Sequence, residues 1–143
     1  MTKPKDITIK RQSGVIPFLR DGKKLKVMLI TPKQMDDIWI FPKGKLEPHL
    51  SVAHSAELEA FEEAGVMGKI ISGQPVGNYT YSKYENTYKV DLFLFEIDKV
   101  LDDWQESHIR KRTLASLKKA DKLLSDKSLR KILKKAAKYL KNK

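Results

Sequence analysis

Residues 39–66 of this 143-residue chain read WIFPKGKLEPHLSVAHSAELEAFEEAGV, and this stretch decides the fold. A short apolar run leads into a loop rich in lysine and glycine, and a helical pattern follows the loop. We expect the helix to begin after the N-cap residue Ser51, to run to Ala64 and to end at Gly65, which can adopt a left-handed backbone conformation. A strand that delivers such a loop to a helix has a geometry that suits phosphate binding.

Three glutamates, Glu59, Glu62 and Glu63, crowd the last turn of this predicted helix. The helix dipole favours cations at that end and penalises carboxylates, so helix stability does not explain them. Their spacing of i, i+3 and i+4 places them on one side of the helix, where we expect the carboxylates to converge on one ion. Divalent metals of the Mg²⁺ class accept oxygen ligands of this kind. The stretch therefore indicates a metal-dependent enzyme.

Strand patterns lie on both sides of the helix. Residues 13–19 and 25–30 are apolar runs joined by turn residues and predict a hairpin. Residues 39–42 predict a short strand, and residues 88–97 carry the strongest strand signal and are expected to form a central strand. From Leu114 onward the apolar period becomes helical.

The length and the composition limit the class of protein. With 143 residues and no cysteine, we expect a single domain over residues 1–143 that has neither disulfides nor a thiolate metal site. The first six residues, MTKPKD, contain no apolar segment, and no apolar run approaches the length of a membrane span. We therefore expect a soluble, cytoplasmic protein that does not enter a membrane.

The positive charge is concentrated near the C-terminus. The net charge is +11, and residues 110–143 contain 14 Lys or Arg against Asp121 and Asp126, which gives +12. Such a segment can attract phosphate-rich ligands, but a solvated lysine-rich helix face is the favoured interpretation. We expect the basic helical segment to cover about 113–143.

The loop and the helix together resemble the Nudix box, which combines a glycine, a glutamate after five residues, an Arg-Glu pair after seven more, a Glu-Glu pair, a glycine and an aliphatic residue. Two positions depart from the pattern, because Leu50 replaces the first glutamate and Leu58 replaces the arginine. We interpret this as an ion pair replaced by an apolar contact that the fold tolerates, while Glu59 loses an orienting arginine. The register of the box is fixed by Gly44, Glu59, Glu62, Glu63, Gly65 and Val66.

Beyond the box, the chain resembles the diphosphoinositol polyphosphate phosphohydrolase branch of the Nudix enzymes. The similar segments are Lys10-Arg11, residues 62–69, residues 100–104 and residues 110–112. The resemblance implies an α/β fold, an α/β/α sandwich around a mixed β-sheet with the Nudix loop-helix and C-terminal helices.

The resemblance also implies an activity. A Nudix pyrophosphohydrolase uses Mg²⁺ or Mn²⁺ to cleave a phosphoanhydride by water attack at phosphorus, here in a diphosphoinositol polyphosphate or a dinucleoside polyphosphate. A catalytically weakened module that binds phosphorylated ligands and an RNA 5′-end pyrophosphohydrolase remain alternatives. We expect a phosphorylated small molecule as the partner, with RNA as the alternative, and either a monomer or a homodimer.

The family pattern assigns roles to individual residues. Glu59, Glu62, Glu63 and the Gly44 carbonyl are the expected metal ligands, and Glu59 and Glu62 are the expected catalytic residues, with Glu62 either a third ligand or a base that orients water. A fourth carboxylate stays open among Asp102, Asp103 and Glu106. The cations expected to face substrate phosphates are Arg11, Lys43, Lys45, Lys89, Arg110 and Arg112.

Overall fold

The computed structural model describes residues 8–142, so the N-terminal residues from which we expect no apolar leader lie outside the described part. A mixed sheet forms the centre, with the strand order β4-β6-β1-β2-β7, while β3 pairs with β1 and β5 pairs with β6. The β1–β6 pairing is parallel and the other pairings are antiparallel. The strands are β1 (Ile9–Asp21), β2 (Lys24–Ile30), β3 (Lys43–Lys45), β4 (Val66–Ile70), β5 (Gly77–Lys83), β6 (Asn86–Val100) and β7 (Arg112–Ser116).

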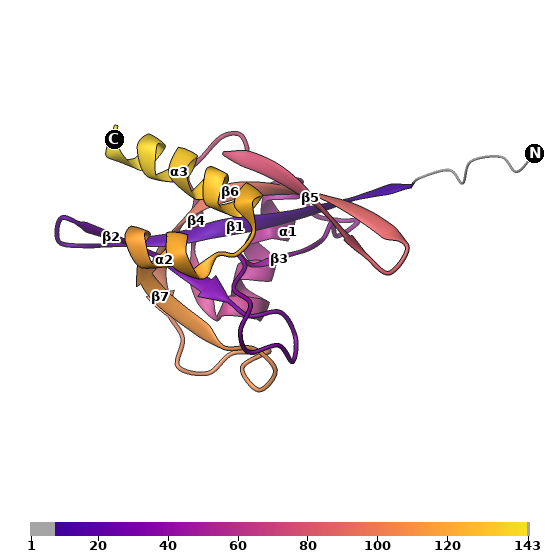
Figure 1. Cartoon of the computed structure of the whole chain (residues 1–143), viewed down its shortest axis with the longest axis horizontal. Helices are drawn as coiled ribbons and strands as arrows, with labels where there is room; N and C mark the ends of the chain where they lie inside the picture. The colour runs from indigo at the N-terminus through magenta and orange to yellow at the C-terminus, as the bar shows by residue number, and fades with distance from the viewer. Residues whose placement is uncertain (1–7, 143) are drawn as a thin grey trace, which may run out of the picture.

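Helices cover both faces of this sheet (Figure 1). Successive residues of a strand point to opposite faces, so Leu92 and Leu94 of β6 enter one core while Phe93 and Phe95 enter the other. The predicted α/β sandwich is therefore confirmed. The helical segments are α1 (Val52–Glu59), the π-helical η1 (Ala60–Ala64), α2 (Leu117–Leu123) and α3 (Lys127–Lys141), of which α1 and η1 pack on one face and α2 and α3 on the other.

The strand predictions hold with two corrections. The hairpin forms as β1 and β2, and β6 lies inside the sheet as expected of the strongest strand pattern. Residues 39–42 make only an isolated bridge between Ile30 and Ile40, and the strand begins after them at β3. Leu114 lies in β7 rather than in a helix, because Arg112–Ser116 pairs with β2 along five residues.

The helix after the loop begins and ends as predicted but changes geometry in the middle. The Ser51 hydroxyl accepts a hydrogen bond from the His54 amide at 3.0 Å, and Gly65 has φ 65° at the other end. Between them, η1 is π-helical, so backbone amides donate to the carbonyl five residues earlier, as the Gly65 amide does to the Ala60 carbonyl. In such a turn, side chains four and five residues apart share a face, instead of three and four.

The C-terminal helix α3 is amphipathic. Its buried side chains pack on the sheet and its lysines point to solvent. Asp126 caps it, because the carboxylate accepts a hydrogen bond from the Ser128 amide at 2.7 Å. Within the described part of the chain, no helix has the length and apolar character needed to cross a membrane.

Candidate active site

Gly44 and Glu59 are in direct contact where the loop meets the helix. The pairing of β3 with β1 places Gly44 opposite Ser13 and presses the loop onto α1. A Cβ atom added to Gly44 would lie 2.2 Å from both Cδ and Oε1 of Glu59. Only glycine therefore leaves room for the carboxylate at this place.

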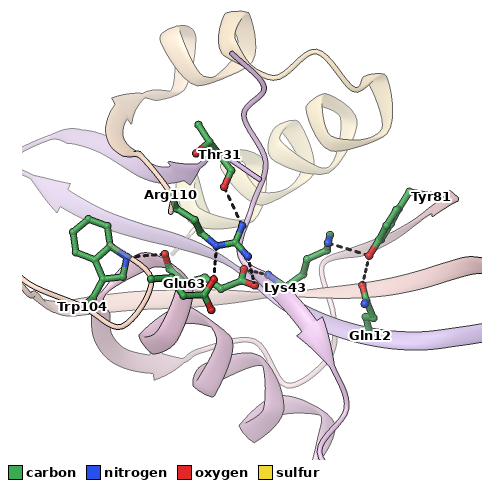
Figure 2. A network of polar contacts seen from close by, with 8 residues as sticks. Gln12, Thr31, Lys43, Glu63, Tyr81, Trp104 and Arg110 are labelled. Atoms are coloured by element: carbon green, nitrogen blue, oxygen red, sulfur yellow. Dashed lines mark hydrogen bonds and ion pairs between the residues drawn. The ribbon is translucent and has the colours of Figure 1, made fainter. Parts of the chain in front are cut away.

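The Glu63 carboxylate is buried and held through both oxygens (Figure 2). Oε1 accepts a hydrogen bond from the backbone amide of Lys43 at 3.0 Å, and Oε2 accepts one from Nη2 of Arg110 at 2.9 Å. The backbone carbonyl of Glu63 accepts a further bond from the Trp104 indole at 3.0 Å. The loop, the helix and the segment before β7 thus meet at this one residue.

Glu59 and Glu63 interact closely and both hold their protons more tightly than usual. Burial, together with the charges of Glu63 and Glu62, raises the pKa of Glu59 to about 8. Burial also raises the pKa of Glu63, although Arg110 and the Lys43 amide act in the opposite direction. Two buried carboxylates that lie side by side form a donor set that suits a divalent cation.

Glu62 is not grouped with them into a site of three carboxylates in this structure, so its expected role as a third ligand stays a prediction. Among residues 8–142, no three Asp, Glu or His side chains are arranged so that they could hold one metal ion. Glu62 is partly exposed, and burial followed by the charges of Glu106 and Glu47 raises its pKa. The π turn of η1 explains the separation, because it aligns Glu59 with Glu63 and leaves Glu62 to one side.

Arg110 is held by the protein rather than turned toward solvent. Its side chain is 7% exposed, Nε donates to Glu106 at 2.7 Å and Nη1 donates to the Thr31 carbonyl at 3.0 Å. With the bond to Glu63, the guanidinium therefore has three protein acceptors. Arg110 also lines the cleft described below, so its expected contact with substrate phosphate stays a prediction, and its bond to Glu106 places that residue, rather than Asp102 or Asp103, beside the glutamate pair.

Arg112 also has a structural environment instead of the expected substrate-facing one. Its guanidinium donates to the carbonyls of Ala64, Gly65 and Leu101 and lies 3.8 Å from the centre of the Trp104 ring. The unpaired carbonyls and the dipole at the end of a helix attract such a cation. Arg112 thus supplies the positive charge that this helix end lacks in its own sequence.

Lys43 is an expected phosphate-binding residue that lines a cleft, as Arg110 does. Nζ of Lys43 donates to the Tyr81 hydroxyl at 3.0 Å and lies 4.4 Å from the centre of its ring, and the same hydroxyl donates to Gln12 at 2.8 Å (Figure 2). Burial lowers the pKa of Lys43. The cleft has a volume of about 320 Å³, and its lining includes Gln12, Lys33, Lys43, Gly44, Glu63, Tyr81, Lys83, Tyr88 and Arg110.

Three other expected cations lie outside this lining and are exposed. Arg11 forms an ion pair with Asp91 at 3.2 Å and lies opposite Lys89 in the β1–β6 register, while Lys45 ends β3. Lys33 and Lys83 line the cleft as well, but neither belongs to a sequence motif, and only the fold brings them there.

Leu50 and Leu58 are not core residues of the described structure. Leu50 is 42% exposed and Leu58 is partly buried, and neither belongs to the two apolar clusters formed by residues 8–142. The apolar contact between them therefore stays a prediction.

The chain is similar in sequence to curated phosphohydrolases. It is 30% identical over 98 residues to diphosphoinositol polyphosphate phosphohydrolase 3-beta of Bos taurus, which covers 68% of this chain and 57% of that protein. It is 29% identical over 117 residues to diphosphoinositol polyphosphate phosphohydrolase 3-alpha of Mus musculus, covering 80% and 69%. The chain thus spans little more than half the length of the cattle relative. No protein-family model matches the chain.

Solved structures share the fold. The Ap4A hydrolase of C. elegans in a binary complex has a TM-score of 0.78 at 20% identity, and the match covers 94% of this chain and 99% of that one. The NUDIX domain of Shewanella oneidensis NrtR, crystallised with ADP ribose, has a TM-score of 0.73 at 12% identity, covering 97% and 94%. At these identities the neighbours establish the fold alone.

Proposed function

Because the chain is a Nudix-family protein that resembles the diphosphoinositol polyphosphate phosphohydrolase branch, we propose that it is a divalent-metal-dependent hydrolase that cleaves a phosphoanhydride. The observation that carries the proposal is the buried pair of Glu59 and Glu63, packed against Gly44 at the edge of a cleft that contains Lys43. This arrangement provides an anionic centre for a cation beside a cationic side chain for a phosphate.

The donor set fits a hard divalent cation such as Mg²⁺ or Mn²⁺. Glu59 and Glu63 would hold it through carboxylate oxygens, with the Gly44 carbonyl as a further ligand. When bound, the ion would neutralise phosphate charge and activate a water molecule. We propose both metals as cofactors, since carboxylate and carbonyl oxygens suit each of them.

The remaining residues of the site bind and orient. Glu62 is partly exposed beside the pair and has a raised pKa, which suits a group that accepts a proton from water. Lys43 is fixed by Tyr81, so its ammonium group is positioned to bind phosphate oxygens in the cleft. Arg11, Lys45 and Lys89 are exposed cations that would reach only outlying phosphates of a larger substrate.

For the substrate, we propose a diphosphoinositol polyphosphate or a dinucleoside polyphosphate. The names of the curated relatives and of the C. elegans structure support these two classes. Lys33, Lys43 and Lys83 all line the cleft, which suits a ligand with several phosphates.

The test is phosphate release from a panel of both substrate classes with Mg²⁺, with Mn²⁺ and with EDTA. We expect turnover that requires metal and is lost in Glu63→Gln, whereas Glu57→Gln on the same helix keeps it. Turnover in EDTA, or a Glu63→Gln protein as active as wild type, would rule the proposal out. Calorimetry that shows binding without turnover would instead support a module that only binds phosphorylated ligands. This alternative is motivated by Leu50 and Leu58, which replace the glutamate and the arginine of the box.

A second candidate function, RNA 5′-end hydrolysis, is favoured by α3. Its 15 residues contain seven Lys or Arg and no acidic residue, and its lysines are exposed. Several contacts to single-stranded RNA would make the binding constant fall steeply with salt, by a logarithmic slope of about −0.7 per phosphate contact. RNA binding that hardly changes with salt would exclude this candidate.

A further inference from the structure

We infer that Arg110 is a positioning residue of the metal site, whose guanidinium fixes the Glu63 carboxylate beside Glu59. This inference rests on the proposed function, and it assigns to Arg110 a role beyond the expected contact with substrate phosphate.

The guanidinium is fixed from three directions (Figure 2). Its three nitrogens donate to Glu63 at 2.9 Å, to Glu106 at 2.7 Å and to the Thr31 carbonyl at 3.0 Å. These acceptors come from η1, from the segment between β6 and β7, and from the residue after β2. A planar donor with three such partners is held in one orientation, and reorienting it would break all three bonds.

Glu63 receives its orientation from this contact. Arg110 binds Oε2 while the Lys43 amide binds Oε1, so the plane of the carboxylate is determined by two donors at 2.9 and 3.0 Å. Glu59 and Glu63 are both buried and lie four residues apart in the same helical segment, which places the two carboxylates on one side of it. Groups that hydrogen-bond a metal-ligating carboxylate commonly set its direction and contribute to metal affinity.

The helix itself offers no such guanidinium. Leu58 stands where the resembled box has arginine, so an arginine must come from elsewhere in the chain if the carboxylates are to be oriented. Arg110 lies 47 residues after Glu63 and reaches it through the fold. The neighbouring Arg112 contrasts with it, because Arg112 binds only backbone carbonyls and an indole ring.

The experiment compares Mn²⁺ affinity, measured by electron paramagnetic resonance, in wild type, Arg110→Met and Arg110→Lys. Arg20→Met is the matched control, since Arg20 donates its hydrogen bond to the Leu140 carbonyl of α3, on the opposite face of the sheet from Glu63. We expect Arg110→Met to bind Mn²⁺ about 10- to 100-fold more weakly. The Mn²⁺ affinity of Arg110→Lys should lie between those of Arg110→Met and wild type, because an ammonium group keeps the charge but loses the planar set of N–H donors.

Steady-state kinetics separate positioning from substrate binding. We expect kcat at saturating metal to fall in Arg110→Lys while the substrate KM changes less than about twofold. A raised KM with unchanged kcat and unchanged Mn²⁺ affinity would show that Arg110 binds substrate, and would overturn the inference.

The outcomes also distinguish this inference from the proposed function. Wild-type protein that fails to bind Mn²⁺ overturns both. Wild-type affinity in Arg110→Met, when wild type binds the metal, overturns the inference alone. If Arg110→Met does not fold, Arg110→Lys decides, and an affinity equal to that of wild type then overturns the inference.

Discussion

Replacing Gly44 by alanine tests the contact between the loop and Glu59. The new Cβ would lie 2.2 Å from the Glu59 carboxylate, whereas real Cβ atoms essentially never approach closer than 3.0 Å. The carboxylate must therefore move by at least about 0.8 Å, and a displacement of this size at a catalytic group costs about 100-fold in rate. Because the carboxylate ends a flexible side chain, it can swing away, and we expect only about 1 kcal/mol of destabilisation.

The assay measures kcat/KM, Mn²⁺ affinity and the melting temperature of Gly44→Ala. We expect the rate and the metal affinity to fall strongly while the melting temperature falls by about 3–4 °C. Gly73→Ala is the control, because a Cβ there has no atom within 4 Å and the backbone is not left-handed. Wild-type turnover and metal affinity in Gly44→Ala would refute the assignment of Glu59 to the metal site.

Three further predictions concern stability, pH and substrate binding. Arg112→Met should lower the free energy of unfolding by about 2–4 kcal/mol, measured by urea denaturation, because three carbonyl groups and an aromatic ring lose their cation; an unchanged midpoint would contradict this. The pKa of Glu59 is raised from 4.5 to about 8 in the folded protein, so in EDTA Glu59 should make the free energy of unfolding fall as the pH rises from about 4.5 to 8. Glu59→Gln should remove this pH dependence, and equal pH profiles of stability for the two proteins would count against it. Tyr81→Phe keeps the ring near Lys43 but removes a hydrogen-bond acceptor of the Lys43 ammonium group, so the substrate KM should rise about 3- to 10-fold with little change in kcat. The control, Tyr84→Phe at an exposed position, should leave KM unchanged. An equal KM in the two variants would argue against a phosphate-binding role for Lys43.

The helix of the site could be predicted because its signals are local. Ser51 as N-cap and Gly65 as the left-handed end are properties of neighbouring residues, and both are confirmed. The predicted convergence of three glutamates assumed regular α-helical periodicity, and Glu62 as a ligand stays a prediction. The π turn over Ala60–Ala64 changes which side chains share a face, and nothing in the composition of AFEEA marks such a turn.

The roles of the arginines depended on contacts between distant segments. Arg110 and Arg112 bind groups on η1 that lie 47 and 48 residues away, so their partners are not visible in a local pattern. One signal was available, because buried carboxylates beside Leu58 require a cation from elsewhere in the chain. The alternation in Arg110-Lys111-Arg112 agrees with it, since the two arginines are partly buried and Lys111 is exposed.

Anomalous diffraction from a crystal grown with Mn²⁺ tests the central claim most directly. The account predicts a Mn²⁺ peak within ligand distance of carboxylate oxygens of both Glu59 and Glu63, and the loss of this peak in Glu63→Gln. A peak at another site, or the same peak with Glu63→Gln, would contradict the claim that this glutamate pair holds the ion.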